Sequence, residues 1–388
     1  MKKVNFRRPP IYRDAGFYLE NASKTRQAFI DEQDPRREPD VYIYSRYRNP
    51  TVAAAEEKIM KLEEASWALL TQSGMSAIDV ALSIFQEGSK TGTWLFFSEI
   101  YGGTNSFIDH VLVRRRGISI HRITPEDGSY NLEKLEKIME EIKPELVYFE
   151  VISNPMLMVA DAPGIIRLAK KYNSRVIIDN TFSTPYLWKP LQAGADLVIH
   201  SATKYFSGHG NLTAGVVCGN NHELLKDALE YRKLAGHMLS PDDAYRLDTQ
   251  IRTFYLRFSR QCENAMALAR LFEQHHNVEI TLYPGLEDHI SHNFAKGLFA
   301  EKGYGAMVTF DIKGRNANEK TVRRDAFINR LSGSIDLVPT LGDTDTILLP
   351  IEPVWGDKYP LPGMIRFSAG IEDTDQLVKM VKDTLDTI

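Results

Sequence analysis

Short apolar runs recur along the first 220 residues of the chain. Those long enough to form strands are "WALLTQ", "TWLFF", "ISIHRI", "ELVYFEVI", "RVIIDN", "DLVIHS" and "AGVVCG". Most are apolar at successive positions rather than at alternate ones, so both faces of the sheet that they form should be covered. Stretches with helical spacing, such as "NLEKLEKIMEEI" and "APGIIRLAKKY", lie between most of them. This alternation predicts an α/β fold with a mostly parallel sheet.

The pattern differs at the two ends of the chain. Residues 1–50 are rich in Arg, Pro and Asp and show little periodicity, and "DEQDPRREPD" is typical of an irregular, exposed arm. After residue 245 a long helical region is followed by shorter strands such as "GAMVTFDI" and "MIRFSAG". We therefore predict an N-terminal arm (1–50), a larger domain (51–245) and a smaller C-terminal α+β domain (246–388).

Composition narrows the classes of function. The chain has 388 residues with a net charge of -4, so no basic excess indicates a nucleic-acid partner. No apolar run reaches the ~18 residues that a membrane span needs, and no apolar segment follows the basic start "MKKVNFRRPP" as a secretory signal would require. Cys218 and Cys262 are the only cysteines, which favours a reducing compartment. We expect a cytoplasmic protein.

Polar residues gather where the predicted strands end. In an open α/β sheet, ligands bind beyond the carboxyl ends of the strands. The residues at these ends include Gly74, Met75, Tyr101, Asn154, Asp179, Ser201, Thr203 and Lys204. Gly74 and Met75 open a helix whose N-terminal N–H groups suit a phosphate, and glycine lets the ligand come close.

These groups match the needs of pyridoxal phosphate. That cofactor takes a lysine for a Schiff base, an acid for its pyridine nitrogen and donors for its phosphate. Taken alone, Lys204 would be a surface charge, Asp179 a turn or helix cap, and Tyr101 a core aromatic. Their joint occurrence at successive strand ends favours the cofactor site over these explanations.

Eight ordered segments between residues 42 and 375 carry a family resemblance: "YSRYRNPT", "QSGMSAI", "YGGT", "SNPMLMVAD", "IDNTFSTP", "ADLVIHSATKYFSGHGNLTAGVV", "GAMVTFDI" and "IRFSAGIED". With them the chain resembles the Cys/Met-metabolism (transsulfuration) family of fold-type I pyridoxal-phosphate enzymes. Its members include methionine γ-lyase, cystathionine γ-lyase, cystathionine γ-synthase and the acylhomoserine sulfhydrylases. The resemblance implies a PLP-dependent transferase fold with a large and a smaller domain.

The resemblance also implies a role for each matching residue. Lys204 would hold the cofactor as a covalent aldimine and relay protons, and Asp179 would pair with the pyridine nitrogen. Tyr101 would stack on the cofactor ring and act as a general acid or base. Asn154 would lie near the phenolic oxygen of the cofactor. The phosphate would be held by Gly74, Met75, Ser201 and Thr203, and by Tyr44 and Arg46 of a neighbouring subunit. Shared sites of this kind imply a dimer with closed symmetry, and pairing of such dimers would give the expected homotetramer, a dimer of dimers.

On the substrate side, Arg366 of "IRFSAG" would grip the α-carboxylate as a bidentate fork. The implied reaction is γ-elimination or γ-replacement on a sulfur-containing or homoserine-derived L-amino acid. Where members that use cystathionine often carry a glutamate, this chain has Pro339 and Thr340, and "LLPIEPVWGDKYPLPGM" replaces the usual "MTH" segment. We therefore expect Thr340 at the substrate end, and a carbon–sulfur lyase related to methionine or cystathionine γ-lyase.

Other functions stay open at this point. A cystathionine γ-synthase or an acylhomoserine sulfhydrylase would use the same site, and methionine γ-lyases often carry a cysteine after "YG", where this chain has "YGGT". An aminotransferase of the same fold would leave the cofactor in its amine form, and a non-catalytic binding protein could have kept the fold. His275 and His276 are adjacent, so we do not expect their side chains to converge, and we predict no metal site.

Overall fold

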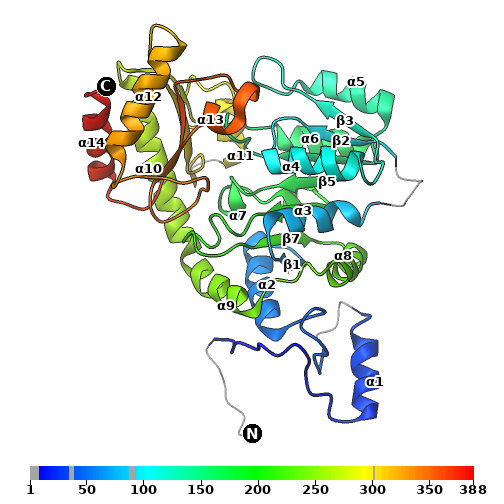
Figure 1. Cartoon of the computed structure of the whole chain (residues 1–388). Coiled ribbons are helices and arrows are strands. Elements are labelled where there is room, and N and C mark those ends of the chain that lie inside the picture. The colour runs from blue at the N-terminus through cyan, green and yellow to red at the C-terminus, as the bar shows by residue number, and fades with distance from the viewer. Residues whose placement is uncertain (1–7, 35–38, 87–91, 300–301) are drawn as a thin grey trace.

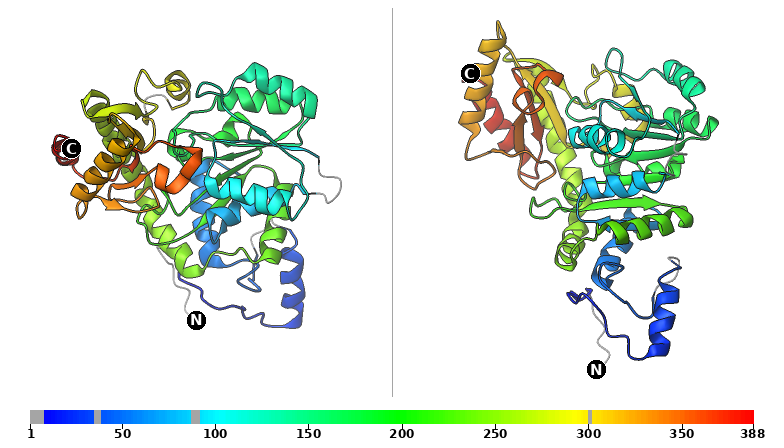
Figure 2. Two further views of the ribbon diagram at one scale, coloured as in Figure 1. Left: turned by 45° about the horizontal axis from the view of Figure 1, so that its top comes forward. Right: turned by 45° about the vertical axis from the view of Figure 1, so that its right-hand side comes forward.

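The computed structural model describes residues 8–34, 39–86, 92–299 and 302–388. The start of "MKKVNFRRPP" and the middle of "DEQDPRREPD" lie outside the described residues. Two sheets stand side by side, each with its own helices, and an N-terminal arm extends away from both (Figures 1 and 2).

The larger sheet contains the strands that the apolar runs predict. In sheet order it runs β1-β7-β6-β5-β4-β2-β3. The strand bounds are β1 Trp67–Thr71, β2 Trp94–Phe97, β3 Ile120–Ile123, β4 Leu146–Glu150, β5 Arg175–Asp179, β6 Leu197–His200 and β7 Gly215–Gly219. β1, β2, β4, β6 and β7 are buried along their whole length, which explains why their sequences do not alternate.

One strand of this sheet departs from the parallel arrangement. β7 pairs antiparallel with both β1 and β6, whereas β6, β5, β4, β2 and β3 pair in parallel. A parallel strand after β6 would need a crossover, usually through a helix. The segment between β6 and β7, residues 201–214, instead forms a series of turns without a helix, and Lys204 lies in it. The prediction of a mostly parallel sheet is confirmed, with β7 as the exception.

Helices pack around the sheet as the spacing predicts. α5 (Leu132–Ile142) buries Leu135 and Met139, and α6 (Ala162–Lys171) buries Ile165 and Ile166. The others in this part are α2 Pro50–Glu63, α3 Gly74–Ser83, α4 Gly102–Phe107 with a π-helical continuation Ile108–Val113, α7 Thr184–Leu187, a 3-10 turn Pro190–Ala193, α8 His222–Ala235 and α9 Pro241–Gln250. In the part of the chain that the structure describes, no helix has the length and apolar character of a membrane span.

A second sheet forms the C-terminal part, in the order β10-β11-β12-β9-β8. The bounds are β8 Val278–Leu282, β9 Met307–Ile312, β10 Asp336–Leu337, β11 Ile347–Pro350 and β12 Met364–Ser368. Its core stacks Phe272 on Phe310, with ring centroids 3.9 Å apart. Its helices are α10 Phe254–Gln274, entered through a 3-10 turn Ile251–Thr253, α11 His292–Phe299, α12 Ala317–Leu331 and α14 Thr374–Leu385. "GAMVTFDI" and "MIRFSAG" are confirmed as strands, while the boundary at residue 245 stays a prediction.

The N-terminal arm is more ordered than its composition suggests. It contains α1 (Ala22–Asp31), so the prediction of an irregular segment is wrong there. Asn21 caps this helix by accepting a hydrogen bond from the Lys24 N–H at 3.0 Å, a start that "NASK" encodes. An exposed ion pair between Arg13 and Asp242 (2.6 Å) is one of the contacts between the arm and the rest of the protein.

Candidate active site

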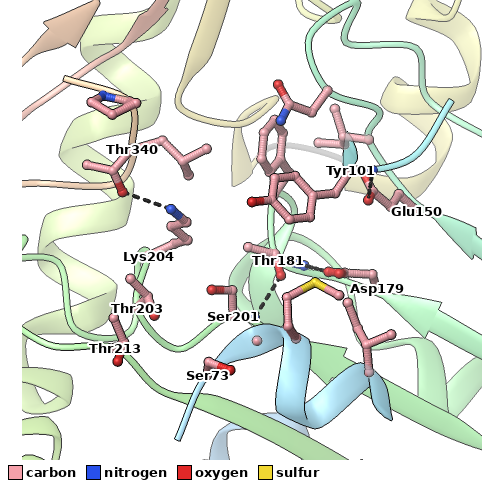
Figure 3. A pocket seen from close by; sticks show the side chains of 18 of the residues that line it. Ser73, Tyr101, Glu150, Asp179, Thr181, Ser201, Thr203, Lys204, Thr213 and Thr340 are labelled. Atoms are coloured by element: carbon pink, nitrogen blue, oxygen red, sulfur yellow. Dashed lines mark hydrogen bonds between the residues drawn. The ribbon is translucent and has the colours of Figure 1, made fainter. Parts of the chain in front are cut away.

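A pocket of ≈ 250 Å³ opens beyond the carboxyl ends of β4, β5 and β6, where it also meets the C-terminal part (Figure 3). Its lining includes ten of the twelve predicted site residues, namely Gly74, Met75, Tyr101, Asn154, Asp179, Ser201, Thr203, Lys204, Thr340 and Arg366. Strand ends that are far apart in sequence meet here because parallel strands end at the same edge of a sheet.

Lys204 projects from the loop that joins β6 to β7. Its Nζ donates a hydrogen bond to Thr340 Oγ1 at 2.8 Å. Burial, with a smaller effect from the Arg366 guanidinium, lowers the pKa of Lys204 to about 8. A lysine near that value is neutral often enough at ordinary pH to act as a nucleophile or a base.

Two carboxylates occupy equivalent positions at the ends of neighbouring strands. Asp179 ends β5 and Glu150 ends β4, and the two residues are partners in the parallel register. Burial raises the pKa of both, and for Glu150 the nearby Asp179 charge adds to the rise. Asp179 accepts a hydrogen bond from the Thr181 N–H at 2.9 Å, which favours its charged form. Glu150 accepts one from the Tyr101 N–H at 2.5 Å and so fixes the start of α4.

The N-terminus of α3 forms one wall of the pocket. Ser73 caps the helix, and its carbonyl accepts the first intrahelical bond, from the Ala77 N–H at 3.1 Å. The N–H groups of Gly74 and Met75 precede that bond, and within the described residues no partner is found for them. A Cβ at Gly74 would lie 3.0 Å from Ser201 Oγ, so glycine permits the close approach of this helix to the Lys204 loop. The wall therefore offers N–H groups and a hydroxyl to an anion.

Tyr101 lies across the pocket with half of its side chain exposed. A Cβ at Gly103 would lie 2.4 Å from the Tyr101 ring, so the "GG" that follows the tyrosine lets the ring lie against the start of α4. The ring lines the pocket and offers it a surface on which a flat ligand could stack.

Arg366 comes from β12 and is buried, with 4% of its surface exposed. Its Nη1 donates to Asn154 Oδ1 at 2.8 Å and its Nη2 to the Thr340 carbonyl at 3.1 Å. Its Nε is buried and makes no hydrogen bond to any described residue. A buried donor without a partner is costly, so this guanidinium is suited to an anionic ligand.

The structure leaves Tyr44 and Arg46 outside the pocket. Both are exposed on the arm, where Arg46 Nη1 donates to the Lys233 carbonyl at 2.7 Å and the guanidinium lies 5.5 Å from the Tyr44 ring centroid. A site completed by the arm of another chain is consistent with this position. Their role at a neighbouring subunit's cofactor stays a prediction.

The sequence analysis does not identify every residue of the pocket, and two of those that it omits, Glu150 and Thr181, lie at strand ends. Glu150 ends "LVYFE" just as Asp179 ends "RVIID". A carboxylate at the end of an apolar run is therefore the sequence signal that indicates Glu150. Thr181, two residues after Asp179, accepts a hydrogen bond from the Ser201 N–H at 2.9 Å and joins two strand ends. Thr203 lines the pocket, but its hydroxyl bonds both the N–H and the carbonyl of Ala214, so it also braces the Lys204 loop.

The adjacent histidines after α10 do converge, so the expectation that their side chains would point apart is wrong. The ligand atoms of His275, His276 and Asp386 lie within 4.8 Å of one another. His275 is nevertheless committed to hydrogen bonds on both ring nitrogens, accepting from the Asn277 N–H at 3.2 Å and bonding Asp386 at 3.0 Å. This cluster is remote from the pocket lining and gives no reason to change the prediction of no metal.

The pocket residues fit pyridoxal phosphate. An amine with a lowered pKa, a buried carboxylate, an aromatic face and a helix N-terminus with free N–H groups surround one cavity. Each answers one need of that cofactor: aldehyde, pyridine nitrogen, ring and phosphate. The unpaired Arg366 Nε suits the carboxylate of an amino acid.

Comparison with known proteins agrees with this assignment. A family model described as "Cys/Met metabolism PLP-dependent enzyme" matches residues 2–386. The L-methionine gamma-lyase of Fusobacterium nucleatum subsp. polymorphum is 34% identical over 98% of this chain and 93% of its own. A cystathionine beta-lyase of Lactococcus lactis subsp. cremoris (strain MG1363) is 33% identical over 92% and 91%. A crystal structure of cystathionine gamma synthase from Xanthomonas oryzae pv. oryzae in complex with cystathionine superposes with a TM-score of 0.85 at 28% identity, over 98% of this chain and 92% of that one.

The chain belongs to the Cys/Met-metabolism family of pyridoxal-phosphate-dependent enzymes. The predicted fold-type I architecture, the cofactor and the class of carbon–sulfur lyases and synthases are confirmed.

Proposed function

We propose that this member of the Cys/Met-metabolism family is a carbon–sulfur lyase that performs γ-elimination on a small sulfur-containing L-amino acid such as methionine. The observation that carries the proposal is the convergence of Lys204, Thr340 and the unpaired Arg366 Nε on one cavity. A lysine beside an anchor for the α-carboxylate is the arrangement that proton abstraction at the substrate Cα requires.

When bound, pyridoxal phosphate would supply an electron sink for negative charge that develops on the substrate. Lys204 would hold the cofactor, and its freed Nζ would take the proton from Cα and move protons between Cα, Cβ and the cofactor. Asp179 would stay ionised through its contact with the pyridine nitrogen, which offsets the burial that otherwise raises its pKa. The N–H groups of Gly74 and Met75, with Ser201, would hold the phosphate.

The remaining residues would orient the substrate. Arg366 would bind the α-carboxylate, with Asn154 and the Thr340 carbonyl holding its Nη1 and Nη2 in place. The Tyr101 hydroxyl would transfer a proton as the γ-thiol departs, with Glu150 holding the tyrosine backbone in place. Water then releases ammonia and a 2-oxo acid, so one methionine would give methanethiol, 2-oxobutanoate and ammonia.

A panel of methionine, homocysteine, cystathionine, cysteine and acylated homoserines, each with and without an added thiol, tests the proposal. We expect 2-oxobutanoate and ammonia from methionine or homocysteine without a second substrate. Pyruvate from cystathionine would instead indicate β-elimination, the activity for which the similar cystathionine beta-lyase of Lactococcus lactis is named. Turnover only with an added thiol would indicate a synthase, and cofactor left in its amine form would indicate an aminotransferase.

The covalent attachment of pyridoxal phosphate to the apoprotein should depend on pH. Only the neutral amine attacks an aldehyde, and the pKa of Lys204 is about 8 rather than near 10.5. We expect the second-order rate, followed by absorbance in stopped flow, to rise with pH and level off above about pH 8. A rate that keeps rising toward pH 10 would contradict the lowered pKa.

We also propose a cytoplasmic homotetramer, built as a dimer of dimers in which each cofactor is held by two chains. The exposed positions of Tyr44 and Arg46, and of the large side chains Tyr18 and Phe29 on the same arm, support an arm that packs on another copy. Cys218 and Cys262 are both free and buried, which suits a reducing compartment. Light scattering of the purified holoenzyme would measure the assembly.

A further inference from the structure

The segment between β11 and β12, residues 351–363, leaves the C-terminal sheet and contacts the larger part of the protein beside the active site. It forms a short helix α13 (Glu352–Trp355) and a 3-10 turn (Gly356–Lys358), where the family's usual "MTH" segment is missing. In Figure 1 it lies between the C-terminal sheet and the edge of the larger sheet near α4.

Contacts at both ends hold this segment in place. On the C-terminal side, Arg324 Nη1 donates to the Pro362 carbonyl at 2.6 Å and lies 3.3 Å from the Glu352 carboxylate. On the side of the larger sheet, the Tyr359 hydroxyl donates to the Glu99 carboxylate, and Lys358 Nζ lies 3.4 Å from the same group.

Trp355 of this segment faces the substrate-binding arginine. The guanidinium carbon of Arg366 lies 5.4 Å from the centroid of the Trp355 ring. The indole is half-buried and packs against a small apolar cluster of Ile351, Tyr359 and Met364, which supports it from behind. An aromatic ring within ~6 Å of a guanidinium attracts it, and most strongly where water is excluded.

The electrostatic setting of Arg366 makes this contact important. Among the ion pairs of the described residues, none joins Arg366 to a carboxylate, and its protein partners are the neutral Asn154 and the Thr340 carbonyl. These two hydrogen bonds hold Nη1 and Nη2, but they do not restrain rotation of the guanidinium plane about the line through those two atoms. A ring against its face restricts that rotation and leaves the buried Nε directed at a ligand.

We propose that Trp355 is a positioning residue for the substrate α-carboxylate, acting through the face of Arg366. The inference rests on the proposed function, because it takes Arg366 as the carboxylate anchor. Residues 351–363 then set the geometry of carboxylate recognition from outside the pocket lining, in place of the family's "MTH" segment.

The test compares Trp355→Ala with Trp355→Phe in the holoenzyme. We expect the alanine variant to raise KM for methionine by roughly 5- to 30-fold with little change in kcat, because cation–π contacts are worth ~1–2 kcal/mol and about 1.4 kcal/mol is tenfold. The phenylalanine variant should restore most of the loss, since it keeps an aromatic face. The calorimetric dissociation constant of glycine, an amino acid with no leaving group, should rise in parallel.

Val354→Ala is the matched control, because Val354 lies on the same short helix with half of its surface exposed. It should leave KM, kcat and glycine binding unchanged, and melting curves should show that all variants are folded. An equal rise of KM in Val354→Ala, or a loss in kcat alone for Trp355→Ala, would overturn the positioning role.

Arg366→Lys separates this inference from the proposed function. We expect a large rise in KM, and in that background Trp355→Ala should add little, since its effect acts through the missing guanidinium. A normal KM for Arg366→Lys would refute the carboxylate anchor itself. A large effect of Arg366→Lys with none of Trp355→Ala would refute only the inference about Trp355.

Discussion

Lys204→Ala should lower kcat by about 1,000-fold or more for every amino acid that the enzyme uses. The change removes both the amine that holds the cofactor and the group that moves protons at the substrate Cα. No other lysine lines the pocket among the described residues, so none stands ready to replace it. Steady-state production of 2-oxo acid would measure the loss.

The protein should nevertheless fold normally without this side chain. Burial disfavours the charged form of Lys204, so loss of this charge should not destabilise the fold. Among the described residues the side chain makes no ion pair, and its one hydrogen bond is to Thr340. Lys189→Ala is a matched control, because Lys189 pairs with Glu64 away from the pocket and should keep full activity. Wild-type turnover by a folded Lys204→Ala enzyme would refute the assignment of Lys204.

Much of the site could be predicted because its residues end strands. Asp179, Asn154 and Lys204 each follow an apolar run, and a parallel sheet brings such ends together whatever lies between them. Glu150 follows the same rule and was missed because it ends a run whose apolar character continues into "VIS". The ten predicted residues that share the pocket were therefore accessible from strand pattern and family resemblance together.

The parts that could not be predicted depend on long-range contacts. The antiparallel course of β7 depends on its pairing with both β1 and β6, and the Lys204 loop that precedes it has no periodicity that would indicate this course. The order of α13 depends on Arg324, Glu99 and the Arg366 face, which are distant in sequence. The wrong prediction for α1 has a different reason, because the Asn21 cap that starts this helix is visible in the sequence.

The closeness of Trp355 to Arg366 illustrates the same limit. The two residues lie on either side of a turn, and nothing in their spacing indicates contact. The family resemblance identified the segment that replaces "MTH", but not that Trp355 within it contacts Arg366. The substrate end of the site is therefore harder to predict from the sequence than the cofactor-binding residues are.

Mixing two inactive variants should restore activity. Arg46→Ala is expected to be inactive or nearly so, because its guanidinium would contribute to the phosphate site of a neighbouring chain, and charge-assisted phosphate contacts are strong. Refolding or subunit exchange of Lys204→Ala with Arg46→Ala chains would produce mixed dimers. One of their two sites would combine an intact Lys204 from one chain with an intact Arg46 from the other, while the second site would lack both.

Equal mixing should thus return about one quarter of wild-type activity. In a dimer with closed symmetry, roughly half of the dimers would be mixed, and each mixed dimer would carry one working site of two.

Arg13→Ala is the control on the same arm, because Arg13 makes an exposed ion pair to Asp242 that contributes little to stability. The Arg13 variant should stay active without mixing. Normal cofactor affinity of Arg46→Ala alone, or no recovery in mixed dimers detected by native mass spectrometry, would refute the shared site. The exposed position of Arg46, outside its own chain's pocket, is the reason that recovery is the expected outcome.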